Sequence, residues 1–371
     1  MPNILHCIDT TGPGGAETVF IGLAERFSRP PFRSVAMIRG PGWVKDQLDT
    51  HGIPVIEEDS RGSVNFRFLC ALVREVRTRG IDLVHAHLLG ANVYCAMAGA
   101  ITGVPVVSTF HGSMDISSRE RMARLKLWIV RKASTTVAVS GSLRDEVAGR
   151  MGVPVNQVKL IQNGIDCARF TGAEPLGLRR RLGLGPEALL IGSLGNIRPA
   201  KAYDVGLKVL AKLRADGVDA HWVVAGQGRP GDRLLGELQT LAGTLGVTPH
   251  VHFLGFVDAP ERFLADLDVF LLCSASEGHP LALVQAMAAG VPVVATRCGV
   301  EGMLGDGARG VLADVGDVAG LAAAVGEIRH KAPETLARSH AARELVRASF
   351  DTEAIFGQYE SLYRDLLGTA R

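Results

Sequence analysis

Short apolar runs alternate with longer amphipathic stretches along almost the whole sequence. The runs contain β-branched residues typical of buried strands, and the stretches between them, such as 17–27 and 66–79, have helical length. Strands that alternate with helices form βαβ units, so the pattern predicts parallel sheets with helices on both faces, an α/β fold. The predicted strands are 4–8, 34–38, 83–86, 106–109, 136–139, 189–194, 221–225, 251–254, 269–272 and 293–295.

The alternation is interrupted at 165–186 and then starts again. Glycine, proline and a cluster of arginines at 179–181 replace the regular pattern there. A chain of 371 residues that is 47% hydrophobic and 21% charged is long and apolar enough for two cores. We therefore expect two α/β domains joined by a linker near residue 170.

Charge and cysteine usage limit the class of protein. The net charge of +2 gives no overall field for nucleic acid, and we expect none to bind. The six cysteines are scattered without metal-ligand spacing, which predicts buried thiols in a reducing compartment. The amino terminus lacks a signal-peptide pattern, and no window of eighteen apolar residues occurs. These features predict a cytoplasmic protein, soluble or attached to a membrane surface.

One carboxylate, Glu277, stands in a loop between the predicted strand 269–272 and a predicted helix at 281–289. In parallel sheets, ligands bind at the carboxyl ends of strands, where helix starts favour anions. A carboxylate does not suit an anion site, so we expect Glu277 to meet hydroxyl groups.

Two other predicted strand-to-helix loops carry phosphate-binding chemistry. The loop at 195–204 contains Arg198 and Lys201, and two cations beside a strand end suit a diphosphate. The loop at 10–15 ends in adjacent glycines, whose backbone amides can approach a phosphate or a sugar hydroxyl. A tight βα turn would require the same glycines. Segment 226–231 matches GxGxxG, but the acidic residue of a dinucleotide site is missing after the next strand, which favours a turn near a nucleotide.

Three histidines lie at the carboxyl ends of predicted strands. His85 and His87 have the spacing of some zinc sites, but no third or fourth ligand is evident nearby, so we predict no metal. His111 ends the strand 106–109, and its ring can donate to a substrate hydroxyl or assist a leaving group, although a solvent-exposed loop histidine is the alternative. Asp266 and Asp268 flank the start of strand 269–272 and are interpreted as capping or strand-edge groups rather than metal ligands.

Taken together, the motifs resemble the retaining glycosyltransferases of the GT-B fold, in family 4, also called group 1. The resemblance covers nearly the whole chain. It rests on GGAE (14–17), DLVHAH (82–87), PVVSTFHG (105–112), GNIRPAK (195–201) and SEGHPLALVQAMAAGVPVVAT (276–296), in this order.

The resemblance implies two Rossmann-like, doubly wound domains that face each other across a cleft. Residues 1–170 would bind the acceptor, residues 171–350 the nucleotide sugar, and residues 351–371 would form a helix that returns to the first domain. The implied reaction transfers a hexose-like unit, with retention, from a UDP- or GDP-sugar to a hydroxyl of a glycan, lipid-linked or small-molecule acceptor. No metal or other cofactor is required. Two alternatives stay open: a GT-B nucleotide-sugar epimerase and a non-catalytic nucleotide-sugar-binding protein.

Carried over by the resemblance, Glu277 contacts donor-sugar hydroxyls, Lys201 and Arg198 hold the diphosphate, and His111 lies near the sugar. The chain departs from the family pattern twice, with Gln285 in place of the second glutamate and Asn196 in place of an arginine. The predicted donor-binding residues are Gly14, Gly15, Asn196, Gly226, Gly228, Gly278, His279, Pro280, Leu281 and Gln285. The predicted acceptor-side residues are Glu17, His87 and Asp115.

The stretch 119–132, RERMARLKLWIVRK, is basic and amphipathic. Met122, Leu125, Trp128 and Ile129 can form an apolar face like that of helices that lie on anionic membranes. A helix that packs on the core with a solvated basic side is equally compatible with the pattern.

Overall fold

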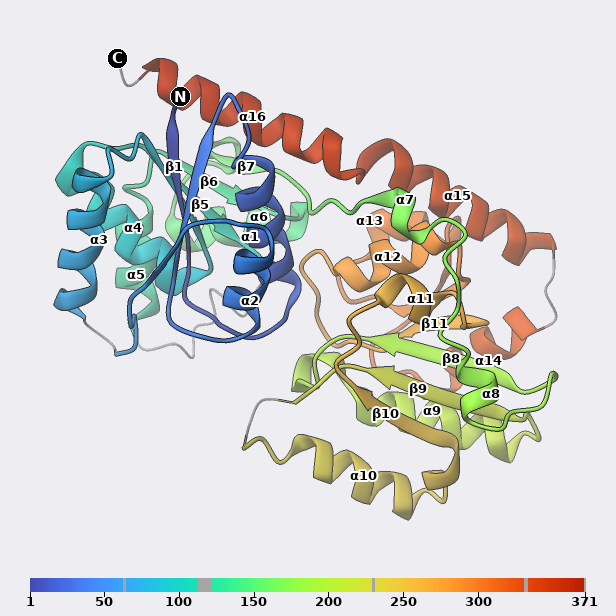
Figure 1. Ribbon diagram of the computed structural model, residues 1–371. Coiled ribbons are helices and arrows are strands. Elements are labelled where there is room, and N and C mark those ends of the chain that lie inside the picture. The colour runs from blue at the N-terminus through green and yellow to red at the C-terminus, as the bar shows by residue number, and fades with distance from the viewer. Residues whose placement is uncertain (63–64, 113–121, 229–230, 330–332, 370–371) are drawn as a thin grey trace. The chain divides into compact units, whose positions relative to one another are not determined.

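The computed structural model describes residues 1–62, 65–112, 122–228, 231–329 and 333–369. The chain forms two compact units (Figure 1). Unit 1 comprises Met1–Gly164 together with Glu353–Arg371, and unit 2 comprises Ile165–Thr352. The binding of acceptor by the first domain and of donor by the second stays a prediction.

Unit 1 contains a parallel sheet of seven strands in the order β3-β2-β1-β4-β5-β6-β7. Side chains alternate between the faces of a strand, so Leu5 and Cys7 join one core while Ile4 and Ile8 join the opposite one. The strands are β1 (Asn3–Ile8), β2 (Arg33–Ile38), β3 (Val55–Glu57), β4 (Leu83–His87), β5 (Val106–Phe110), β6 (Thr135–Ala138) and β7 (Val158–Leu160).

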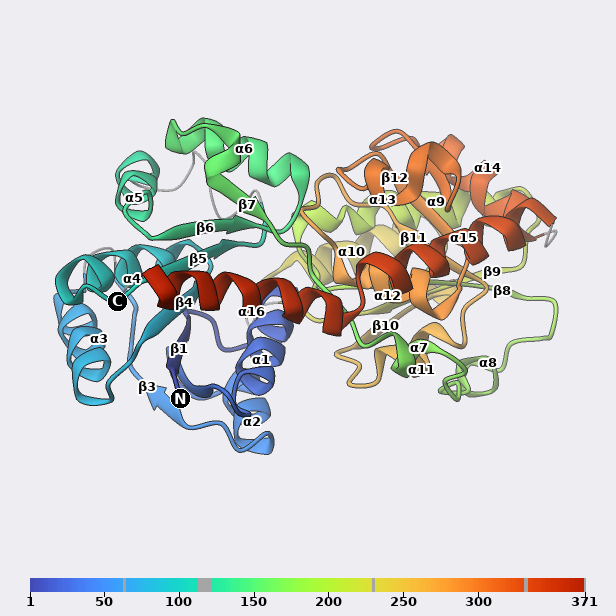
Figure 2. The same cartoon turned by 90° about the horizontal axis from the view of Figure 1, so that it is seen from above.

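Helices cover both faces of this sheet. One face packs against α3 (Phe66–Thr78), α4 (Leu89–Thr102), α5 (Ala123–Val130) and α6 (Gly141–Met151). The other packs against α1 (Gly15–Arg26), α2 (Trp43–Thr50) and the carboxyl-terminal α16 (Thr352–Thr369). Figure 2 shows α16 running along the first sheet. A segment from the end of the chain therefore completes the core of unit 1.

Unit 2 contains a parallel sheet of six strands in the order β10-β9-β8-β11-β12-β13. One face packs on α9, α10 and α14, while α12 packs against α11 and α15 (Figure 1). The strands are β8 (Leu189–Leu194), β9 (Ala220–Ala225), β10 (Val251–Gly255), β11 (Val269–Leu272), β12 (Val293–Thr296) and β13 (Val311–Ala313). The helices are α7 (Cys167–Phe170), α8 (Leu178–Arg181), α9 (Tyr203–Ala215), α10 (Leu234–Thr244), α11 (Pro260–Leu264), α12 (Leu281–Ala289), α13 (Glu301–Leu304), α14 (Val318–Arg329) and α15 (Pro333–Ser349).

Each sheet reverses its strand order once. In unit 1 the chain runs from β1 outward to β3 and then resumes on the other side of β1 with β4. In unit 2 it runs from β8 outward to β10 and resumes beside β8 with β11. Loops at the carboxyl ends of the two strands flanking such a switch point diverge, and α/β proteins bind ligands there. The fold thus directs attention to the loops after β1 and β4 and after β8 and β11.

The predicted α/β fold with parallel sheets is confirmed, and the corrections concern details. The strands β3, β7 and β13 were missed because each has only three residues and is partly exposed. Cys70 is exposed, unlike the other five cysteines, because it lies on the outer side of α3. The arginine cluster of the expected linker instead forms α8. No helix among the described residues is long and apolar enough to cross a membrane.

Candidate active site

The switch point of unit 2 brings Lys201 and Glu277 together. Lys201 lies in the loop after β8, and Glu277 in the loop after β11. The Nζ atom of Lys201 lies 2.7 Å from Oε1 of Glu277, and their side chains are only 19% and 11% exposed. Two residues 76 positions apart thus form a partly buried ion pair at the carboxyl edge of the sheet. The predicted sugar-binding carboxylate and the predicted phosphate-binding lysine are therefore neighbours.

The backbone around Lys201 is strained and firmly held. Lys201 ends a short 3-10 helix (Pro199–Lys201), and Ala202 follows with φ of 47°, a left-handed conformation that is unfavourable for a residue with a Cβ. The N–H of Ala275 donates to the carbonyl oxygen of Ala200 at 2.8 Å, and so ties the β8 loop to the β11 loop. Strain of this kind persists only where surrounding contacts fix it, commonly at ligand sites.

The carboxylate of Glu277 is held by its own loop as well as by Lys201. The hydroxyl of Ser274 donates to Oε1 of Glu277 at 2.5 Å, and the backbone N–H of Glu277 donates to the carbonyl of Cys298 at 2.8 Å. Both side-chain contacts use the same carboxylate oxygen. These contacts within unit 2 therefore fix the orientation of the carboxylate.

Two glycines allow the loops after β8 and β9 to approach closely. Gly195 has φ of 149°, which favours glycine. A Cβ atom on Gly226 would overlap the carbonyl oxygen of Gly195. Gly226 is thus required for packing against the β8 loop, whereas a Cβ on Gly228 would meet no atom within 4 Å.

Helix starts supply further groups for an anion. The N-cap residues of α9 and α12 are Ala202 and Pro280, and neither makes a side-chain cap hydrogen bond. Backbone N–H groups at a helix start, with the positive end of the helix dipole, form an anion site. Pro280 is the N-cap of α12, Leu281 its first residue, and Gln285 lies one turn further on and is half-buried.

The remaining donor-side residues surround these loops. Gly278 and His279 connect Glu277 to α12, and burial lowers the pKa of His279 to about 4, so its ring is neutral at pH 7. Asn196 is half-buried beside Gly195, and Arg198 is exposed. The structure thus gathers the predicted donor residues of unit 2 at one edge of its sheet.

In unit 1, two carboxylates lie near the switch point, Asp9 in the loop directly after β1 and Glu17 in the first turn of α1. A Cβ on Gly14 would overlap the carboxylate of Glu17, which therefore folds back onto the start of its own helix α1. A Cβ on Gly90, in the first turn of α4, would overlap the carboxylate of Asp9. Burial raises the pKa of Asp9 to about 6, with a smaller contribution from Glu17. Sequence reasoning missed Asp9, although its position directly after β1 was a usable signal.

The histidines of unit 1 form a continuous cluster. Nδ1 of His87 lies 2.9 Å from Nε2 of His111, and the rings of His85 and His87 are 4.2 Å apart. Burial lowers the pKa of His111 to about 3, and the pKa values of His85 and His87 lie well below the usual range for the same reason. All of these rings are therefore neutral at pH 7. Asp115, another predicted acceptor-side residue, lies outside the described residues.

His6 belongs to the same cluster, although the sequence did not indicate it. His6, His85 and His87 offer ring nitrogens within 4.8 Å of one another, which fits the spacing of a metal-binding group. However, both ring nitrogens of His85 are already paired with the hydroxyls of Tyr363 and Thr109. A buried dication with only neutral ligands would also be costly. The absence of a metal stays a prediction.

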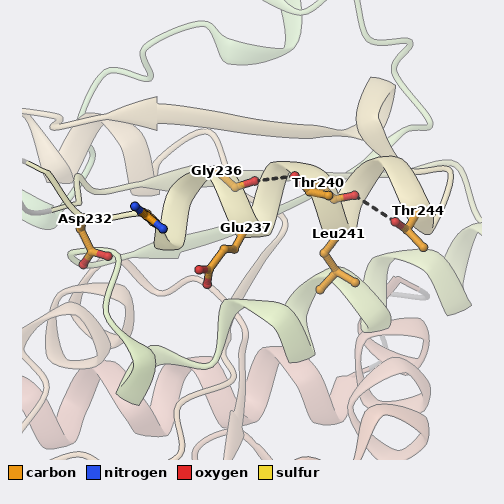
Figure 3. A pocket seen from close by; sticks show the side chains of 7 residues that line it. Asp232, Gly236, Glu237, Thr240, Leu241 and Thr244 are labelled. Atoms are coloured by element: carbon orange, nitrogen blue, oxygen red, sulfur yellow. Dashed lines mark hydrogen bonds between the residues drawn. The ribbon is translucent and has the colours of Figure 1, made fainter.

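A shallow groove runs along α10 (Figure 3) and includes none of the predicted site residues. It is lined by Asp232, Arg233, Gly236, Glu237, Thr240, Leu241 and Thr244. We assign this groove no role in catalysis.

Comparisons with known proteins agree with this geometry. A family model described as Glycosyltransferase Family 4 matches residues 13–169, and one described as Glycosyl transferases group 1 matches residues 186–330. The chain is 30% identical over 309 residues to N-acetyl-alpha-D-glucosaminyl L-malate synthase of Bacillus anthracis, covering 81% of this chain and 79% of that protein. The chain belongs to glycosyltransferase family 4. It is a glycosyltransferase of a retaining family that uses nucleotide-sugar donors.

Two further comparisons extend the relationship. The putative glycosyltransferase EpsF of Bacillus subtilis is 27% identical over 303 residues, covering 78% of each chain. The Anabaena protein HepE, solved in complex with UDP and glucose, is 25% identical, with a TM-score of 0.88 over 98% of this chain and 100% of that chain. The family-4 chain thus has the GT-B fold, with two Rossmann-like sheets.

Proposed function

We propose that unit 2 binds the donor of this family-4 transferase at the β8 and β11 loops. The observation that carries the proposal is the Lys201–Glu277 ion pair at the switch point of the sheet, beside the starts of α9 and α12. Lysine and helix N–H groups suit a diphosphate, and a carboxylate suits sugar hydroxyls. A nucleoside-diphosphate sugar contains both groups.

The leaving group of the reaction is a nucleoside diphosphate, so negative charge grows on it as the glycosidic bond breaks. Lys201, Arg198 and the helix N–H groups would stabilise that charge. Lys201 is paired with Glu277. Donor binding would therefore transfer the ammonium group from the carboxylate to a phosphate oxygen, which frees Glu277 to accept hydrogen bonds from the sugar.

We propose uridine as the base, because HepE has been solved with UDP-glucose at 25% identity to this chain. A thermal-shift panel of UDP, GDP, ADP and their glucose conjugates tests this. A ligand at a hundredfold excess over its Kd stabilises the folded protein by about 2.7 kcal/mol. UDP should raise the melting temperature and GDP and ADP should not; a rise with GDP alone would contradict the assignment.

Unit 1 would bind the acceptor at the loops after β1 and β4. Glu17, Asp9 and His87 place carboxylate and imidazole groups at the switch point of that sheet, where they could bind acceptor hydroxyls. The test is release of UDP from UDP-glucose in the presence of L-malate, inositol phosphate or oligosaccharides. Turnover that depends on one acceptor supports transfer; an epimerised nucleotide sugar formed without acceptor would contradict it.

We also propose that α5 contacts anionic membranes. Its buried face consists of Ala123, Leu127 and Val130, whereas Leu125 and Trp128 are exposed among cationic neighbours such as Lys132, whose Nζ lies 5.7 Å from the Trp128 ring. Exposed apolar groups beside cations suit an anionic bilayer surface. Residues 119–121 of the predicted basic stretch lie outside the described residues.

Flotation with phosphatidylglycerol vesicles tests this contact. Binding at low salt should fall at least fivefold in Leu125→Ser/Trp128→Ser. The matched control is Leu336→Ser, which removes another exposed leucine, on α15 of unit 2. Equal flotation of the native protein, the double variant and the Leu336→Ser control would refute the proposal. So would a failure of the native protein to bind the vesicles at low salt.

A further inference from the structure

The two side chains that hold the Glu277 carboxylate differ in their exposure to solvent. Nζ of Lys201 lies 2.7 Å from Oε1, and the hydroxyl of Ser274 donates to the same oxygen at 2.5 Å. The side chain of Lys201 is 19% exposed, whereas Ser274 is 1% exposed. A ligand in the loops after β8 and β11 can therefore reach the ammonium group but not the serine hydroxyl.

The hydroxyl of Ser274 is fixed by contacts that do not involve the side chain of Lys201. Thr296, at the end of β12 and itself fully buried, donates from its hydroxyl to the carbonyl oxygen of Ser274 at 2.5 Å. The backbone N–H of Glu277 donates to the carbonyl oxygen of Cys298, just beyond β12, at 2.8 Å. The loop after β11 is thus bound to β12 and to the residues that follow it. Movement of the Lys201 ammonium group would leave these contacts in place.

The second carboxylate oxygen, Oε2 of Glu277, makes no hydrogen bond to any residue that the structure describes. It is not shut off from solvent, since the buried side-chain atoms that lack a partner do not include it. A carboxylate can accept hydrogen bonds at both of its oxygens. The protein thus occupies Oε1 and leaves Oε2 accessible to a hydroxyl group.

We propose that Ser274 is a positioning residue that keeps the Glu277 carboxylate directed at the donor sugar while Lys201 binds the diphosphate. The inference rests on the proposed function, in which a phosphate oxygen takes the ammonium group from Oε1. The attraction between opposite charges would otherwise draw the carboxylate after the ammonium group and towards the diphosphate, an anion that repels it. The buried hydroxyl of Ser274 cannot be taken by the phosphate and so retains Oε1. Oε2 then remains available to the sugar.

A crystal structure of the native protein with UDP tests whether the two contacts separate. We expect Lys201 to have left Oε1 of Glu277, while the hydroxyl of Ser274 stays within about 3 Å of that oxygen. A carboxylate that leaves Ser274 and stays with Lys201 beside the phosphates would overturn this inference alone. UDP bound elsewhere, with both contacts unchanged, would remove the proposed donor site and the inference with it.

Titration calorimetry with UDP and with UDP-glucose tests the role of the hydroxyl in Ser274→Ala. The Kd for UDP should stay within about threefold of the native value, since Lys201 and the helix N–H groups remain. The Kd for UDP-glucose should rise about tenfold or more, because the carboxylate is no longer held towards the sugar. Ser274→Cys retains a weak donor and should give an intermediate loss.

The matched control is Ser193→Ala. It removes another buried serine hydroxyl of unit 2, which donates to the carbonyl oxygen of Leu271, and should change neither Kd. Urea denaturation of both alanine variants shows whether a loss of affinity merely follows a loss of stability. Equal losses of affinity for UDP and UDP-glucose in Ser274→Ala, or native affinity for both, would refute the positioning role.

Discussion

Replacement of Lys201 by alanine should weaken UDP binding with little change in the fold. Lys201 is one of two cations in the β8 loop, and its side chain is 19% exposed, with Nζ 2.7 Å from Oε1 of Glu277. A hydrogen bond to a charged group contributes about 1.5–3 kcal/mol, and each 1.4 kcal/mol is tenfold in affinity. Lys201→Ala should therefore raise the Kd for UDP about 10- to 150-fold in isothermal titration calorimetry.

A matched control separates this site effect from a general loss of positive charge. Lys208, on the same helix–loop segment, pairs at 3.2 Å with Asp204 and is well exposed. Lys208→Ala removes the same charge and should leave the Kd for UDP within twofold, since an exposed pair contributes little. UDP binding of native strength by Lys201→Ala would refute our placement of the diphosphate.

Glu277→Gln should not weaken the binding of UDP, in contrast to Lys201→Ala. The carboxylate competes with phosphate for the Nζ atom of Lys201, and UDP has no sugar hydroxyls to lose. The variant should bind UDP at least as tightly as the native protein, yet should transfer sugar at least a hundredfold more slowly. Weaker UDP binding by this variant would contradict the division of roles between carboxylate and lysine.

Three further predictions concern stability. Gly226→Ala forces a Cβ against the carbonyl oxygen of Gly195 and should lower the free energy of unfolding, measured by urea denaturation, by about 1–3 kcal/mol. Gly228→Ala places its Cβ in open space and should not lower it. Equal stabilities of the two variants would contradict the packing argument. The pKa of Asp9 is raised to about 6, so folding favours its protonated form and the stability contributed by this group falls as the pH rises from about 4 to 6. Asp9→Asn should therefore raise the free energy of unfolding by up to about 3 kcal/mol at pH 7.5 but not at pH 4. Equal gains at the two pH values would exclude the buried carboxylate as the cause. Asp268→Ala deprives a guanidinium and the backbone N–H of Leu190 of their acceptor and should cost about 1–3 kcal/mol in the same assay; native stability would refute a structural role.

Most of the fold could be predicted because short stretches of sequence indicate its strands and helices. Apolar runs and helical stretches alternate, and glycine and proline separate them, so two parallel sheets followed from the sequence. The short strands β3, β7 and β13 escaped because three residues give almost no periodicity. The family resemblance indicated Lys201 and Glu277, but only the structure reveals that the two side chains form an ion pair.

Contacts between distant residues could not be predicted. Nothing in the sequence around His85 indicates that Tyr363, on α16, lies against its ring. His6 enters the same cluster because β1 and β4 are adjacent and in a register that pairs His6 with His85. Asp268 was interpreted as a capping or strand-edge group, and it also holds Arg179 of α8. Such pairings depend on sheet order and helix docking, which local sequence patterns do not encode.

The most direct test of the account is a crystal structure of the protein with UDP bound. We expect a β-phosphate oxygen within about 3 Å of Nζ of Lys201, next to the first N–H groups of α12, with the Lys201–Glu277 ion pair broken. UDP bound elsewhere, for example in the groove along α10, with Lys201 still paired to Glu277, would contradict the account.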